Sequence, residues 1–124
     1  MGNRKHRSGR YEHATETAPE VFSYLEACFG APPSVNEDGA DLVLPDGTTI
    51  EVKSAKEWTK SVWSGGGRRR GRFVFHGYEN ADYFLFVLVR ENGMLQLHLE
   101  TYITAISRFG ISGTINWTQF REFN

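Results

Sequence analysis

The sequence predicts a single α/β domain that spans residues 15–124 and follows a basic, flexible N-terminal tail of residues 1–14. Three observations support this prediction. The chain has 124 residues, which is enough for one hydrophobic core but not for two. Hydrophobic residues make up 40% and aromatic residues 14% of the chain, as in a folded globular protein rather than a disordered one. The hydrophobic pattern runs helix, hairpin, strands and helix, without internal repeats.

The first predicted element is a helix that begins near Thr17 and ends at Gly30. Thr17-Ala18-Pro19-Glu20 resembles a capping box with a proline early in the helix. A glycine followed by Pro32-Pro33 is a typical end of a helix. The apolar stripe that we expect to face the core, with a buried thiol in it, consists of Val21, Phe22, Leu25, Cys28 and Phe29. A single cysteine excludes an internal disulfide.

The segment 39–53 reads as two short strands joined by a tight turn. Pro45-Asp46-Gly47 has the residues of a three-residue hairpin loop, which pairs Leu44 with Thr48. Continuing the antiparallel register places Asp41 opposite Glu51 and Gly39 opposite Lys53. Side chains alternate along a strand, so the apolar residues of the hairpin share one face. Asp41, Glu51 and Lys53 share the other, and a slip of one residue would bury them.

The rest of the chain shows three further strands and two further helices. Residues 72–76 and 94–99 alternate between polar and apolar side chains, whereas 82–89 are nearly all apolar, as in a strand covered on both faces. A helix is expected over 101–109, ended by Gly110, and Asn116 is placed to cap a short C-terminal helix.

Two carboxylates and an ammonium on one sheet edge are suited to hold a divalent metal against a phosphodiester. Two ionised carboxylates repel each other unless a cation lies between them. Mg²⁺ binds through one or two carboxylates, water and substrate phosphates. The alternative is an ordinary pair of acids on a solvated face, with Lys53 as a salt-bridge partner. The position of Asp41 and Glu51 beside a tight turn, with an apolar opposite face, favours the metal site.

Gly39-Ala40-Asp41-Leu42-Val43-Leu44, followed by Ile50-Glu51-Val52-Lys53-Ser54, resembles the core of the PD-(D/E)XK nuclease superfamily. This superfamily includes restriction endonucleases and Holliday-junction resolvases. The resemblance implies a restriction-endonuclease-like domain in which a central mixed β-sheet is flanked by helices. It also implies that Asp41 and Glu51 are metal ligands and that Lys53 is the catalytic lysine. Ala40 stands where many members have proline, and Asp46 lies in the turn, pointing away from Glu51.

The resemblance also implies one further acid on the first helix, facing the same metal. Glu20, Glu16 and Glu12 are the candidates, and Glu20 ranks first because it lies closest to the apolar stripe. Capping of the helix is the competing explanation for Glu20. We expect the backbone carbonyl of Val52 to assist Asp41 and Glu51 as a ligand. No histidine pair has the spacing of zinc ligands.

Positive charge is concentrated in two segments although the formal net charge is −1. Four basic residues lie in the N-terminal tail. The second cluster follows the Glu-x-Lys strand directly and consists of Lys56, Lys60, Arg68, Arg69, Arg70 and Arg72. Beside a phosphodiester site we expect this cluster to bind the nucleic-acid backbone. Gly65-Gly66-Gly67 indicates a flexible segment that orders on nucleic acid, and Trp58 and Trp63 are candidates for base stacking.

The sequence therefore predicts a Mg²⁺-dependent endodeoxyribonuclease, with Mn²⁺ able to replace Mg²⁺, that acts on duplex or branched DNA as a homodimer. A cytoplasmic location is expected, because no apolar run has membrane-spanning length and the N-terminus lacks the apolar stretch of a signal peptide. Two alternatives stay open. Arg70-Gly71-Arg72-Phe73-Val74-Phe75 partly matches a strand of an RNA-recognition motif, which would bind without catalysis. The chain could also be an inactive nuclease-fold subunit of a larger complex.

Overall fold

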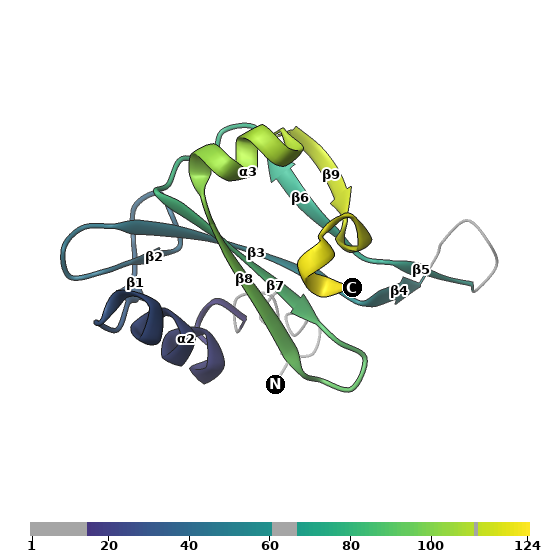
Figure 1. Cartoon of the computed structure of the whole chain (residues 1–124), viewed down its shortest axis with the longest axis horizontal. Helices are drawn as coiled ribbons and strands as arrows, with labels where there is room; N and C mark the ends of the chain where they lie inside the picture. Colours follow the sequence, from purple (N-terminus) through teal and green to yellow (C-terminus); the bar gives the residue numbers. More distant parts are fainter. Residues whose placement is uncertain (1–14, 61–66, 111) are drawn as a thin grey trace, which may run out of the picture.

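The computed structural model describes residues 15–60, 67–110 and 112–124. A five-stranded mixed sheet forms the centre of this single α/β domain, with helices α2 (Pro19–Phe29) and α3 (Tyr102–Phe109) on opposite sides of it (Figure 1). The strands are β1 (Ser34–Val35), β2 (Leu42–Val43), β3 (Thr49–Lys56), β4 (Trp58–Lys60), β5 (Arg68–Arg70), β6 (Arg72–His76), β7 (Tyr83–Val89), β8 (Leu95–Thr101) and β9 (Ser112–Asn116). Two 3₁₀ turns, η1 (Trp117–Gln119) and η2 (Arg121–Phe123), end the chain.

The hairpin β2–β3 has the register that the turn chemistry predicts. Leu42 pairs with Ile50, and the amide of Leu44 donates to the carbonyl of Thr48 at 2.8 Å. Gly47 takes the left-handed backbone conformation (φ +93°), which glycine adopts without strain. Asp46 accepts a hydrogen bond from the Thr48 amide at 2.9 Å, so it serves the turn, as expected.

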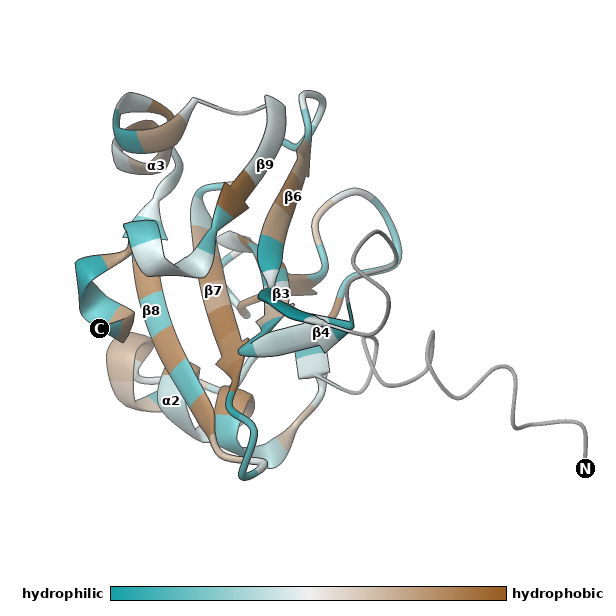
Figure 2. Cartoon of the chain, turned by 90° about the vertical axis from the view of Figure 1, so that its right-hand side faces the viewer, coloured by the Kyte–Doolittle hydropathy of each residue, from teal (hydrophilic) through white to brown (hydrophobic). Residues whose placement is uncertain are grey.

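The sheet has the order β1-β2-β3-β7-β8, and β3 and β7 are its one parallel pair. Every other neighbouring pair is antiparallel. Strand β7 is covered on both faces, as its continuous apolar sequence predicts: Phe84 and Phe86 enter one core cluster, and Leu85 and Val87 enter the other. Apolar residues also dominate β6 and β7 in Figure 2.

Helix α2 covers one face of the sheet. Its buried residues Val21 and Leu25 pack against apolar side chains of β2, β3 and β7. The capping-box prediction is wrong: the N-cap residue is Ala18, which offers no side-chain acceptor, and Pro19 in the first turn needs none for its missing N–H. Cys28 is exposed rather than buried, although it shares a face of α2 with Val21 and Leu25, because it lies in the last turn of the helix, past these two buried residues.

The other face of the sheet is covered by strands as well as by a helix. Strands β6 and β9 form a separate antiparallel pair, which packs with α3, η1 and η2 over β7 (Figure 1). The long connection between the parallel strands β3 and β7 contains the hairpin β4–β5 and strand β6, and its described residues form no helix. The prediction of a sheet flanked by helices therefore holds only in part. The strand β9 and the hairpin β4–β5 were not predicted from the sequence.

Glycine is required where the connection passes the end of β3. A Cβ added to Gly71 would lie 2.0 Å from the carbonyl oxygen of Lys56, closer than any side chain can approach. The close approach of Gly71 to the Lys56 backbone allows the start of β6 to lie against the end of β3.

In the part of the chain that the structure describes, no helix is long and apolar enough to cross a membrane.

Candidate active site

A cavity of about 500 Å³ lies beside the edge of β3, where β2 has ended its pairing. It brings together residues that are distant in sequence: Glu16, which precedes α2, and residues of the hairpin β2–β3, strand β6 and the β6–β7 turn. Its polar lining consists of Glu16, Asp41, Glu51, Lys53, Ser54, His76, Tyr78 and Glu79. The three residues of the predicted acid–Glu-x-Lys pattern therefore line one cavity.

The hairpin register places Asp41 beside Glu51. Asp41 lies one residue before β2, and its Oδ2 accepts a hydrogen bond from the backbone amide of Val52 at 2.8 Å. This bond replaces the ladder bond that β2 would have made, and it fixes the carboxylate at the edge of β3. The apolar residues Leu42, Ile50 and Val52 point to the opposite face, under α2, as the alternation predicts.

Lys53 is buried and makes an ion pair with Glu79, a residue that the sequence analysis missed. The side chains of Lys53 and Glu79 are 9% and 2% exposed. The Nζ of Lys53 also lies 3.8 Å from Oε2 of Glu51. Glu79 in addition accepts backbone hydrogen bonds from His76 at 2.9 Å and from Gly77 at 3.0 Å. These bonds fix Glu79 in the β6–β7 turn, and Glu79 in turn fixes the ammonium group.

The carboxylates of the cavity have strongly shifted pKa values. Burial raises the pKa of Glu16 from 4.5 to about 7, and Asp41 adds to this rise by its charge and by a side-chain hydrogen bond. Burial and then the charge of Asp41 raise the pKa of Glu51 to about 7, against the opposing effect of Lys53. Burial alone would also raise the pKa of Glu79, but hydrogen bonds from Lys53 and His76 hold it at about 2.

The fourth acid of the cavity is Glu16 rather than Glu20. Glu20 is exposed in the first turn of α2 and does not line the cavity, so the first choice of the sequence analysis is corrected. Helix α2 begins at Pro19, so Glu16 precedes it and lines the cavity, whereas Glu20 lies in the first turn of the helix, outside the lining. Glu12, the third candidate, lies outside the described residues.

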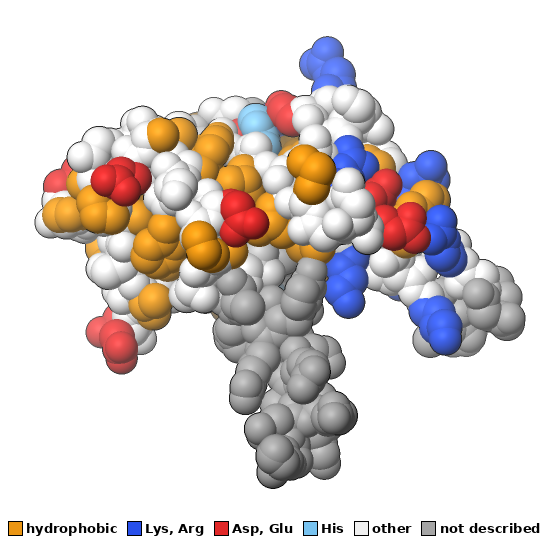
Figure 3. All heavy atoms as spheres, turned by 90° about the horizontal axis from the view of Figure 1, so that it is seen from below, with side chains coloured by type: hydrophobic (Ala, Val, Ile, Leu, Met, Phe, Trp, Pro, Cys, Tyr) orange, Lys and Arg blue, Asp and Glu red, His pale blue; other side chains and the backbone are white. Residues whose placement is uncertain are grey.

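The predicted basic cluster is spread over four strands, with Lys56 on β3, Lys60 on β4, Arg68–Arg70 on β5 and Arg72 on β6. Arg68, Arg69 and Arg70 form β5, which pairs with β4 so that Arg70 lies opposite Trp58. The guanidinium groups of Arg68 and Arg70 stack on the Trp58 ring at 4.5 and 4.9 Å from its centroid, and Arg68 also pairs with Glu91. Lys and Arg side chains gather at this end of the molecule in Figure 3. Trp63 and most of the triglycine segment lie outside the described residues.

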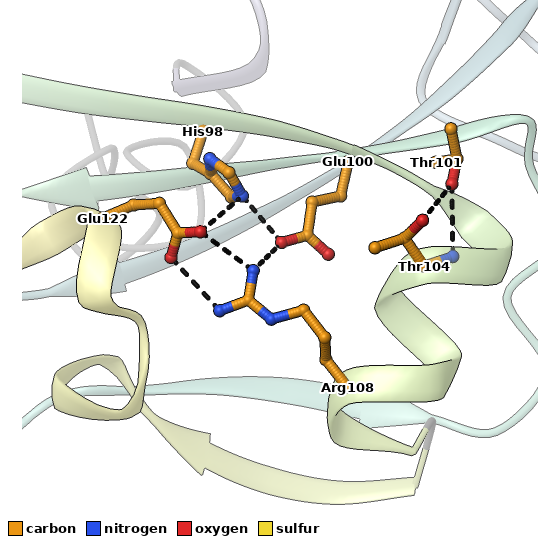
Figure 4. A network of polar contacts seen from close by, with 6 residues as sticks. All are labelled: His98, Glu100, Thr101, Thr104, Arg108 and Glu122. Carbon is orange, nitrogen blue, oxygen red and sulfur yellow. Dashed lines mark hydrogen bonds and ion pairs between the residues drawn. The ribbon is translucent and has the colours of Figure 1, made fainter.

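A second polar cluster joins β8, the last strand of the sheet, to α3 and η2 (Figure 4). Nε2 of His98 lies 2.7 Å from Glu100 and 3.4 Å from Glu122. Among the described residues, these three are the one group of potential metal ligands whose atoms lie within 4.8 Å of one another. However, Arg108 pairs with both carboxylates, so the cluster already holds a cation, and we interpret it as a structural ion network.

Stability in the absence of metal is expected to depend on pH in two opposite ways. The pKa values of Glu16 and Glu51 are raised, so the folded state binds protons more tightly and loses stability as pH rises from about 4.5 to about 7. The depressed pKa of Glu79 gives stability that is present above about 4.5 and is lost as pH falls toward 2. Urea unfolding at several pH values with EDTA measures both effects.

The control for this prediction is Glu51→Gln, which removes one of the two carboxyls with a raised pKa. The loss of stability between pH 4.5 and 7 should become smaller in this variant, while the acid side of the profile stays unchanged. Equal profiles for the two proteins would show that Glu51 has an ordinary pKa.

Comparisons of the chain with protein-family models, with curated proteins and with solved structures found no match. The geometry of the cavity and the short resemblance around Asp41, Glu51 and Lys53 are therefore the basis for any functional argument.

Proposed function

We propose that this protein is a metal-dependent endonuclease that hydrolyses DNA phosphodiester bonds in the cavity beside β3. The observation that carries the proposal is the meeting of Glu16, Asp41, Glu51 and Lys53 in one cavity. The order of helix, hairpin and parallel strand supports a restriction-endonuclease-like core, although strands replace a helix in the connection from β3 to β7. The proposal includes a homodimer, since a cut through both strands needs two such cavities.

The donor set of the cavity fits a hard divalent cation. Glu16, Asp41 and Glu51 offer carboxylate oxygens, and Val52 offers a backbone carbonyl in the same lining, which are the ligand types of Mg²⁺ and Mn²⁺. Burial is the main cause of the raised pKa values of Glu16 and Glu51, and the charge of Asp41 adds a repulsion that a cation would relieve. The three carboxylates are not all within 4.8 Å of one another, so binding requires side-chain adjustment. A bound cation would lower the pKa of a water molecule and neutralise phosphate charge.

Lys53 has a distinct role in this proposal. The ammonium group donates a hydrogen bond to Glu79, and Glu51 lies 3.8 Å away as an ion-pair partner beyond hydrogen-bond distance. Of its three N–H donors, one therefore bonds to a described carboxylate, and another would donate to a phosphate oxygen or orient the attacking water. The positive charge offsets the negative charge that develops on the phosphate in the transition state. The anchored position of Lys53 means that little reorganisation is needed at the moment of reaction.

The RNA-recognition alternative loses the feature on which it was based. That module stacks bases on exposed aromatic side chains of its sheet. Phe73 and Phe75, which would have this role, are 0% and 3% exposed, and they pack against Phe86 inside the core.

Purified protein is expected to cut DNA with Mg²⁺ or Mn²⁺ and to lose this activity when EDTA is added. A panel of labelled linear duplex, four-way junction, flap, single-stranded DNA and single-stranded RNA identifies the preferred substrate. The resemblance to PD-(D/E)XK nucleases implies products with 5′-phosphate and 3′-hydroxyl ends, which ligation of the products can check. Cutting that persists in EDTA would contradict the metal site, and binding without cutting of any substrate would contradict the enzyme.

A further inference from the structure

We propose that one strand of the nucleic acid runs from the carboxylate cavity along the edge of β3 to the hairpin β4–β5, and that cleavage therefore requires about five nucleotides on one side of the cut. The cleavage test of this inference rests on the proposed function, whereas its binding test does not.

The surface is continuous from the carboxylate cavity to the hairpin β4–β5. A second cavity, of about 250 Å³, adjoins the carboxylate cavity and shares Ser54 with it. Thr15 lines this second cavity and its chain neighbour Glu16 lines the first, so the two also meet on the side toward α2. The second cavity ends at Thr59 and Arg72, on strands β4 and β6. Together the two cavities form a groove along β3 from Asp41 to Thr59. Among the described residues, no strand pairs with β3 on this side beyond Ile50.

The charge of the lining residues changes from negative to positive along the groove. Its first part is acidic and suits a cation. Its far part is lined by Lys56 and Arg72 among other residues. Arg69 lies opposite Thr59, and alternation along β4 and β5 places both side chains on the face of the hairpin that Trp58 does not occupy. The guanidinium groups of Arg69 and Arg72 make no ion pair with a described residue, whereas that of Arg68 pairs with Glu91.

The positive charge in the far part of the groove complements the phosphates of a nucleic acid, so we assign the groove to a polynucleotide strand. Phosphate contacts from Lys and Arg position a nucleic acid without reading its sequence. Strands rise about 3.3 Å per residue, so Glu51 and Lys56 are roughly 17 Å apart along β3. At an axial spacing of about 3.4 Å per phosphate in one strand of a duplex, this distance corresponds to about five nucleotides. The other candidate occupant is an extended peptide that adds a strand to the edge of β3.

The binding test uses the double variant Arg69→Ala/Arg72→Ala and a fluorescein-labelled 20-base-pair duplex in EDTA. Fluorescence anisotropy at several salt concentrations gives the slope of log K against log salt. Loss of two phosphate contacts should reduce the magnitude of this slope by about 1.8. Arg121→Ala is the matched control, because Arg121 is an exposed arginine of η2 and does not line the groove. Equal slopes for the double variant and this control would overturn the proposal.

The same measurement separates the two occupants. Displacement of the DNA by a seven-residue polyglutamate peptide, at a concentration similar to that of an unlabelled duplex, would assign the groove to acidic peptides and overturn the proposal. Failure of the peptide to compete supports it.

The cleavage test uses a duplex with a label at either end and Mg²⁺. Cuts should be absent within about five nucleotides of one type of end, 5′ or 3′, and present near the other. A symmetrical pattern would overturn the groove while leaving the endonuclease intact. If the protein proves not to cut DNA, the salt slopes still decide whether the groove binds it.

Discussion

Replacing Glu51 with Gln should reduce DNA cleavage by more than the roughly 100-fold that is typical for loss of a residue that merely supports a metal ligand. The amide keeps the size of the side chain but removes the charge that would hold the cation. Because the pKa of Glu51 is raised to about 7, the ionised carboxylate is disfavoured in the folded protein. The neutral variant should therefore be at least as stable as the natural protein at pH 8. Cleavage rates and urea unfolding measure the two effects.

The combination of lost activity and retained or increased stability distinguishes a functional residue from a structural one. Glu26→Gln serves as the matched control, because Glu26 lies exposed on α2 and should affect neither quantity. Retention of activity in Glu51→Gln would remove Glu51 from the site. Loss of activity together with a large loss of stability would mean that the carboxylate acts in folding.

Replacing Glu79 with Ala should lower the free energy of unfolding by about 3–5 kcal/mol, because it leaves the ammonium of Lys53 buried without a partner. The side chain of Glu79 is 2% exposed, so little water can replace it. The backbone amides of His76 and Gly77 would also lose their acceptor. Urea unfolding, followed by tryptophan fluorescence, measures this loss. DNA cleavage should fall as well, since Lys53 is no longer held in place.

The double variant Lys53→Met/Glu79→Ala tests the cause of this effect. Removing both charges leaves no unpaired buried ion, so the double variant should be more stable than Glu79→Ala. It should nevertheless be inactive, because the proposed reaction needs the ammonium. If the double variant is as unstable as Glu79→Ala, the contribution of Glu79 comes from its bonds to the β6–β7 turn rather than from Lys53.

The sequence determines the hairpin and its charged face because turn chemistry and alternation agree there. Pro45-Asp46-Gly47 sets the turn, and the apolar residues on either side permit only one register. The same agreement explains why the boundaries of β6, β7 and α3 were predicted closely. Thr101 caps α3 with its side chain, a signal that is visible in the sequence.

The partners of Lys53 could not be predicted in the same way. Glu79 lies in the turn Gly77-Tyr78-Glu79-Asn80, which has no periodicity and no motif, and only the packing of β6 beside β3 brings it to the lysine.

Glu16 was a candidate on sequence, but its ranking depended on where α2 begins, and helix starts are poorly determined when the N-cap is alanine. The hairpin β4–β5 is rich in arginine and glycine, which concealed its strands.

The parallel pairing of β3 with β7 has a consequence for when the cavity beside β3 forms during folding. Lys53 and Glu79 are 26 positions apart, and Thr49 bonds to Asp82 across 33 positions. Chains that depend on such distant contacts pay the entropy of loop closure before they gain stability, and they fold more slowly than chains of local contacts. A nascent chain that has not yet closed this loop holds the acids of the β2–β3 hairpin without an anchored lysine. The cavity beside β3 is therefore completed in the same step that closes this loop.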